Sequence, residues 1–229
     1  MLNNIDAVAF DIDGTLYPNY RFYLRVLPKA LFCLRLLWAF AGARRRLRRE
    51  GVAVASFHDL QARFCAEILR AGNKAPDTET VKTLISRHIY ASWENLFSGI
   101  APFSYVKECV SSFRERGLKL AVLSDFPIGK KIDRLGLSGL WDAELSSEDI
   151  GALKPHPLPF HRLAEALETP PQRILYVGNS PAYDVAGAKN AGMMTALRCL
   201  FPRFPPGRQG LADTFIFNHY RQLQEYVLR

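Results

Sequence analysis

The sequence predicts an α/β protein with a doubly wound, mostly parallel sheet and an inserted helical segment. Two observations lead to this prediction: short apolar runs alternate with helical patterns, and one stretch after the first run has helical patterns alone. Unbroken apolar runs are typical of parallel strands that are buried on both faces. In such a sheet the polar residues that follow the strands meet at its carboxyl edge, where ligands bind.

Each of the first predicted strands ends in a polar residue or a turn. Asp11 follows the first apolar run, Ser124 follows the second and Gly178 follows the third. Glycine, proline or polar turns close the helical patterns between them. The predicted strands are 5–10, 118–123, 174–177, 193–197 and 214–217, and the predicted core helices are 105–116, 156–167, 181–191 and 219–228.

Residues 17–98 interrupt the alternation of strand and helix. They contain helical patterns, clearest at 57–70 and 78–97, and no convincing strand. We therefore assign residues 1–16 and 99–229 to the core and 17–98 to a helical insertion.

The unusual part of the insertion is 26–50, an apolar helix candidate that runs into five arginines. Lys29 and Arg35 interrupt an apolar stretch that is already shorter than the ~20 residues a membrane span needs. The segment could pack inside the protein, contact another subunit in a homo-oligomer, or lie on a membrane surface. The arginines either form a solvated helix face or recognise an anionic substrate or lipid headgroup; they are Arg44, Arg45, Arg46, Arg48 and Arg49.

Composition limits the setting and the partners. The hydrophobic content of 48% argues against disorder, and the net charge of +8 favours an anionic partner. No recognised nucleic-acid-binding motif is present, so we expect no specific nucleic acid. The four cysteines are scattered and form no C-x-x-C, which predicts a reduced, cytoplasmic setting, and we expect no secretion signal.

The stretch FDIDGTLYP, residues 10–18, places two carboxylates two residues apart directly after a predicted strand. Asp11 and Asp13 would repel each other, and a divalent cation would relieve that repulsion. Magnesium prefers oxygen ligands of the kind that carboxylates, carbonyls and phosphates supply. A solvated acidic turn is the alternative interpretation of this stretch when it is considered alone.

Four motifs follow one another in order: DIDGT at 11–15, LSD at 123–125, GALKPHPLPF at 151–160 and GNSPAYD at 178–184. With this set, the chain resembles the haloacid dehalogenase (HAD) superfamily, in the phosphatase-like branch with a helical cap inserted after the first motif. The resemblance implies a Rossmann-like core and a magnesium-dependent phosphomonoesterase. Such an enzyme would hydrolyse a small phosphorylated metabolite through an aspartyl-phosphate intermediate.

The resemblance also implies residue roles. Asp11 would be the nucleophile, and Asp13 would act first as the acid and then as the base. True dehalogenases of the superfamily lack the second aspartate, so Asp13 favours phosphoryl chemistry. Lys154 would neutralise charge on Asp11 and on the phosphoryl group. Phosphate contacts are implied for Thr15, Ser124, Asp125 and Lys154, and metal contacts for Asp11, Asp13, Asn179 and Asp184.

Asn179 departs from the family pattern G-D-x-x-x-x-D, because an amide replaces the first acid. Its carbonyl oxygen can still bind magnesium, with one negative charge fewer. The substitution therefore predicts weaker magnesium binding. Asn179 also supports one alternative, a catalytically weakened binding or regulatory protein. Residues 26–50 suggest another, a membrane-associated lipid-phosphate phosphatase. A phosphomutase is the third, because phosphomutases of the superfamily keep both aspartates.

Overall fold

The computed structural model describes residues 5–71, 74–200 and 211–229 of the chain. Its core is a six-stranded sheet in the order β3-β2-β1-β4-β5-β6, and every neighbouring pair of strands is parallel. The order reverses at β1, which lies between β2 and β4, so the predicted doubly wound sheet is confirmed. The strands are β1 (Ala7–Phe10), β2 (Lys119–Ser124), β3 (Ala143–Ser146), β4 (Ile174–Gly178), β5 (Met194–Arg198) and β6 (Thr214–Phe217).

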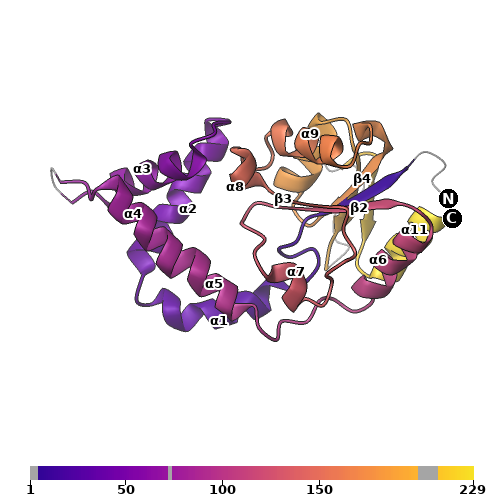
Figure 1. The fold of residues 1–229 in the computed structure, drawn as a ribbon, viewed down its shortest axis with the longest axis horizontal. Coiled ribbons are helices and arrows are strands. Elements are labelled where there is room, and N and C mark those ends of the chain that lie inside the picture. Colours follow the sequence, from indigo (N-terminus) through magenta and orange to yellow (C-terminus); the bar gives the residue numbers. More distant parts are fainter. Residues whose placement is uncertain (1–4, 72–73, 201–210) are drawn as a thin grey trace.

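Helices cover both faces of the sheet, because alternate residues of each strand point to opposite sides. Val8 and Phe10 of β1 pack toward α6 (Val106–Glu115) and α11 (Tyr220–Leu228). Ala7 and Ala9 pack toward the opposite layer, where the small side chains admit Phe160 and Leu163 of α9. That layer contains α9 (Pro157–Ala166) and α10 (Ala186–Asn190) (Figure 1).

Three short elements complete the core: α7 (Lys131–Arg134), α8 (Ser147–Ile150) and the 3-10 turn η2 (Pro171–Arg173). The π-helical turn η3 (Pro181–Val185) leads directly into α10, where the sequence predicts a single helix. Strand β3 has no counterpart among the predicted strands. It is a four-residue edge strand with the exposed Glu144 in its middle, so it lacks the apolar run by which the other strands are found.

The regular elements of the insertion are helices, and Figure 1 shows them to one side of the sheet. Most of their buried apolar residues form a cluster that Leu153 of the core joins, whereas Phe22 and Phe97 pack in the cluster of the sheet. Domain boundaries at 16/17 and 98/99 stay a prediction. The predicted helix at 78–97 is continuous but contains a π-helical turn. The helices are α1 (Asn19–Ala30), α2 (Leu34–Arg49), α3 (Phe57–Leu69), α4 (Thr78–Ile85), η1 (Ser86–Tyr90) and α5 (Ala91–Leu96).

Residues 26–50 form parts of two helices, since the chain turns between α1 and α2 at residues 31–33. Leu36, Phe40 and Leu47 of α2 are buried in the cluster of the insertion, whereas Phe32 and Trp38 are 94% and 64% exposed. No helix in the described part of the chain is long and apolar enough to cross a membrane.

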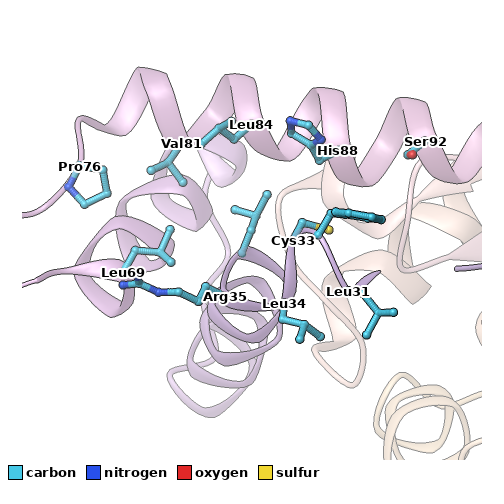
Figure 2. Close-up of a pocket in the computed structure, with 12 residues that line it drawn as sticks. Leu31, Cys33, Leu34, Arg35, Leu69, Pro76, Val81, Leu84, His88 and Ser92 are labelled. Atoms are coloured by element: carbon cyan, nitrogen blue, oxygen red, sulfur yellow. The ribbon is translucent and has the colours of Figure 1, made fainter. Parts of the chain in front are cut away.

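A cavity of about 770 Å³ lies inside the insertion. Figure 2 shows that Leu69, Val81 and Leu84 line it from α3 and α4, with Cys33 and Arg35 on the side of α2. Its lining contains neither an aspartate nor a glutamate, and none of the predicted site residues reaches it. The predicted site residues therefore lie outside this cavity, at the edge of the sheet.

Candidate active site

An acid cluster lies at the carboxyl edge of the sheet, around the ammonium group of Lys154. Asp11 follows β1 directly, Asp184 lies in η3 after β4, and Lys154 belongs to the loop between α8 and α9. The Lys154 Nζ atom lies 2.7 Å from Asp11 Oδ1 and 2.7 Å from Asp184 Oδ1. All three side chains are buried, so one cation bridges two carboxylates away from water.

This arrangement shifts the pKa of Asp11 and the pKa of Lys154. Burial raises the pKa of Asp11 to about 7; the Lys154 charge opposes that rise, and the nearby charges of Asp184 and Asp13 add to it. Burial works against protonation of Lys154, but the two carboxylates outweigh it and raise its pKa well above the ordinary value. Lysine 154 is therefore held as a cation beside the predicted nucleophile.

Tyr176 and Thr15 complete the surroundings of Asp11 and Lys154. The Thr15 hydroxyl donates to Asp11 Oδ2 at 2.8 Å, and Lys154 Nζ donates to the Tyr176 hydroxyl at 3.2 Å. Both oxygens of Asp11 are therefore oriented by a donor on this chain.

Asp13 faces a different set of groups. Its carboxylate accepts hydrogen bonds from the Tyr17 hydroxyl at 2.6 Å and the Ser124 hydroxyl at 2.9 Å, and it pairs with Lys131 Nζ at 3.1 Å. Burial raises the pKa of Asp13, but the charge of Lys131 and these hydrogen bonds outweigh burial and lower it. Asp13 is thus held ionised, in the state that can accept a proton.

Asp125 and two arginines link the insertion to this site. The Asp125 carboxylate accepts from the Lys154 main-chain N–H at 3.0 Å and from Arg48 Nη2 at 2.6 Å. Arg48 Nε also donates to the Lys154 carbonyl at 3.0 Å. Arg44 pairs with the buried Glu148 and donates to the Asp125 carbonyl at 2.9 Å. Arginines of α2 therefore hold the loop that carries Lys154, and a contact of Asp125 with phosphate stays a prediction.

The arginine run is thus divided between several environments. Arg44 and Arg48 face the core, and Arg46 pairs with Glu50 and Glu67 on the surface. Of the five arginines in the run, Arg45 and Arg49 are exposed. The sequence offered two interpretations of these arginines, a solvated helix face and an anion site. Neither includes the contacts of Arg44 and Arg48 with acidic groups of the core.

Asn179 lies beside Gly14 and close to Asp184. Its main-chain N–H donates to Asp184 Oδ2 at 3.1 Å, and Ser180 N–H donates to the same oxygen at 2.9 Å. Gly14 has a φ of +92°, and a Cβ atom placed on it would lie 2.1 Å from Asn179 Nδ2. The left-handed backbone favours glycine at position 14, and any larger residue would also force the Asn179 side chain to move.

The predicted site residues meet at one edge of the sheet. Sequence reasoning did not identify the groups that orient these side chains, because no motif marks them. Tyr17 follows Asp13 by four residues, but tyrosines and lysines occur at many surface and core positions, so their presence alone does not indicate a site. The residues that sequence reasoning did not single out are Tyr17, Lys131, Glu148 and Tyr176; Arg44 and Arg48 were singled out, but not for their contacts with acidic groups of the core.

The oxygen atoms at this edge are of the types that bind a divalent cation. Asp11, Asp13 and Asp184 bring three negative charges against two from Lys131 and Lys154. Burial is the main cause of the raised pKa of Asp11, and the charges of Asp184 and Asp13 add to it. Within the described ranges no three acid, histidine or cysteine side chains gather at metal-binding spacing. A metal here would therefore combine two carboxylates with carbonyl or amide oxygen, as the predicted set does.

A cavity of about 240 Å³ opens between the insertion and the core next to Lys131. Tyr90 and Trp93 line it from the insertion, and Phe126 lines it from the loop after β2. Because Lys131 contacts Asp13, this cavity adjoins the site.

Comparisons with known proteins agree with this geometry. The family model described as haloacid dehalogenase-like hydrolase matches residues 5–192. A glyceraldehyde 3-phosphate phosphatase of Methanopyrus kandleri is 29% identical over 200 residues, covering 83% of this chain and 82% of that protein. A phosphoglycolate phosphatase of Haemophilus influenzae is 29% identical over 205 residues, covering 84% of each. The solved structure of an L-2-haloacid dehalogenase shares the fold, with a TM-score of 0.70, 20% identity and coverage of 99% of this chain and 100% of that one.

Proposed function

This chain belongs to the haloacid dehalogenase-like hydrolase family, and on that premise we propose that it is a magnesium-dependent phosphatase of small phosphorylated metabolites. The observation that carries the proposal is the cluster of Asp11, Asp13 and Lys154 at the carboxyl edge of the sheet. The names of the sequence relatives support the phosphatase class, and the presence of Asp13 favours it over dehalogenation.

In the first half-reaction a carboxylate oxygen of Asp11 attacks phosphorus, and the bond from phosphorus to the ester oxygen breaks. The leaving oxygen takes a proton from Asp13, which requires Asp13 to be protonated when substrate is bound. A phosphate dianion next to Asp13 would raise the pKa of its carboxyl group and so favour that state. Lys154 stabilises the negative charge that builds up on the phosphoryl oxygens.

In the second half-reaction Asp13 takes a proton from a water molecule as that water attacks the phosphorus atom of the aspartyl-phosphate. The bond from phosphorus to Asp11 breaks, and inorganic phosphate leaves. Tyr17, Ser124 and Lys131 fix the Asp13 carboxylate for both steps through the contacts described above. Thr15 and Ser124 would also contact the phosphoryl oxygens.

We assign the magnesium ligands to Asp11, the Asp13 carbonyl, Asn179 and Asp184. The cation would neutralise phosphoryl charge and lower the pKa of Asp11, so that the nucleophile is ionised. In this structure Lys154 and Thr15 each donate a hydrogen bond to one oxygen of the Asp11 carboxylate. The Asp184 carboxylate accepts hydrogen bonds from Lys154 and from two main-chain N–H groups.

The leaving group would occupy the cavity beside Lys131, whose volume of about 240 Å³ suits a small organic group. Its aromatic lining, Tyr90, Trp93 and Phe126, gives apolar contact with the carbon skeleton of a substrate. The insertion that supplies two of these rings would act as the cap over the site.

The test is release of inorganic phosphate from a panel of phosphorylated metabolites and one aryl phosphate, with magnesium and with EDTA. Wild type should release phosphate only with magnesium, and Asp11→Asn should abolish release. Asp149→Asn is the matched control, because the Asp149 carboxylate is 67% exposed and far less constrained. Folded wild type that is inactive on the whole panel would support a catalytically weakened binding protein instead. Phosphate that moves to another position of the substrate without release would indicate a phosphomutase.

A second proposal concerns residues 26–50. Leu31, Phe32 and Trp38 are at least 64% exposed, and Arg35 is exposed beside them. Exposed apolar side chains next to arginine, on a chain of net charge +8, fit contact with an anionic bilayer surface. We propose that this surface binds such a membrane, which would bring lipid phosphates within the substrate range.

Co-sedimentation with phosphatidylserine vesicles tests this surface. Wild type should bind, and the double variant Phe32→Ser and Trp38→Ser should not; Val54→Ser, which changes an exposed apolar residue elsewhere, is the control. No binding by wild type would reject the membrane. If gel filtration then shows a dimer that the double variant disperses, the surface joins two copies of the chain.

A further inference from the structure

A second group of hydrogen-bond donors lies around Arg198, at the end of β5. The Arg198 side chain is 6% exposed, and its guanidinium carbon lies 3.3 Å from the centroid of the Phe103 ring. Nη1 makes a long contact of 3.5 Å with the Gly14 carbonyl, and the buried Nε meets no hydrogen-bond acceptor among residues 5–71, 74–200 and 211–229. Arg198 is therefore a buried cation with a donor that these residues leave unused.

No carboxylate in the described part of the chain pairs with Arg198. Burial lowers the pKa of Arg198, as expected for a cation held away from water. The sequence between Arg198 and Ala212 contains no acidic residue, so the adjoining segment cannot supply a counter-ion. A buried charge without a partner is costly and calls for an anion from outside the chain.

A cavity of about 280 Å³ opens beside this guanidinium. Asn19 and Asn179 line it, and their Nδ2 atoms lie 2.6 Å and 2.1 Å from the position of a Cβ atom built on Gly14. Two amide groups and a guanidinium thus converge near the bare Cα of Gly14, and no acidic residue lines the cavity. The lining combines donors and apolar groups without a competing negative charge.

We propose that this cavity is an anion site that binds a small oxyanion, the carboxylate or phosphate group of a metabolite, through Arg198, Asn19 and Asn179. The guanidinium offers the planar pair of N–H groups that suits both oxyanions. Asn19 Nδ2 also donates to the Asp13 carbonyl at 3.2 Å, so an anion held by Asn19 is one side chain away from the loop of Asp13. The site does not depend on phosphatase activity.

Calorimetric titration of the full chain tests the proposal, with malonate and inorganic phosphate as probes, in EDTA and at an ionic strength fixed with KCl. Wild type should bind at least one probe in a 1:1 complex, and the stronger of the two identifies carboxylate or phosphate as the ligand group. Arg198→Met should weaken that binding at least roughly tenfold, the scale of one lost charged hydrogen-bonding group. Arg49→Met, which removes the same charge from an exposed position, should leave it unchanged.

A further variant, Ser124→Ala, distinguishes phosphate bound at the acid cluster from phosphate bound at Arg198. Binding that persists in Arg198→Met and is lost in Ser124→Ala belongs to the acid cluster. Arg198→Lys keeps the charge and provides a second variant in case Arg198→Met does not fold; it should bind at least threefold more weakly. Four results would overturn the proposal: neither probe binds wild type, Arg198→Met binds both probes with wild-type affinity, Arg198→Lys does so, or Arg49→Met weakens binding equally. Phosphate release from substrates is scored separately, so failure here leaves the phosphatase proposal standing.

Discussion

Replacing Arg44 by methionine should destabilise the protein strongly, because Arg44 is half of a buried ion pair between the insertion and the core. Arg44 is 4% exposed and its partner Glu148 is 1% exposed. Burial lowers the pKa of Arg44 to about 10, yet the group stays charged at neutral pH. Arg44→Met leaves the Glu148 carboxylate buried, and among the described residues its remaining donor is the Tyr90 hydroxyl at 2.8 Å.

The expected magnitude follows from that burial. Removing one partner of a buried pair costs about 3–5 kcal/mol in the free energy of unfolding, because the other charge is left uncompensated. For a chain of this size 1 kcal/mol shifts Tm by about 2–4 °C, so Tm should fall by roughly 10 °C. Arg44 also lies 4.1 Å from the centroid of the Phe126 ring, and losing that contact adds to the effect.

The assay is thermal and urea unfolding followed by circular dichroism, with a double variant and a surface control. Arg44→Met with Glu148→Met removes both charges, so it should recover most of the stability lost in the single variant. Arg162→Met breaks an exposed pair with Glu165, whose side chains are 55% and 62% exposed, and should cost less than about 1 kcal/mol. The reasoning is refuted if Arg44→Met costs no more than Arg162→Met, or if the double variant is as unstable as the single one.

Three further predictions concern the acid cluster. Asn179→Asp should tighten magnesium binding and lower the magnesium concentration needed for half-maximal activity, since it adds one negative charge; an unchanged requirement would show that residue 179 is not a metal ligand. Lys131→Met should lower kcat roughly tenfold or more with an intact fold, because Asp13 loses the cation that positions it, and an unchanged kcat would remove Lys131 from that role. Lys154→Met should lower kcat by roughly 10²–10³-fold and reduce stability, because Asp11 and Asp184 are left buried without a cation; retained Tm in a melting experiment would contradict the bridging role.

The motif residues show how far local sequence goes. Asp11, Ser124 and Gly178 were identified because each follows an apolar run, and parallel strands bring such positions to one edge. The strand register confirms that these positions share one edge, since Phe10 of β1 pairs with Val122 of β2 and with Val177 of β4. Strand β3 was missed because a short edge strand needs no apolar run.

The sequence by itself determined five of the six strands, the family and the set of acids at the sheet edge, since periodicity and motif spacing are local properties of the chain. Only the tertiary structure decided which cation serves which carboxylate. Arg44 meets Glu148 across 104 positions, and Lys131 meets Asp13 across 118. Such pairings depend on how the insertion docks on the core and which groups lose water together, and no local pattern records either.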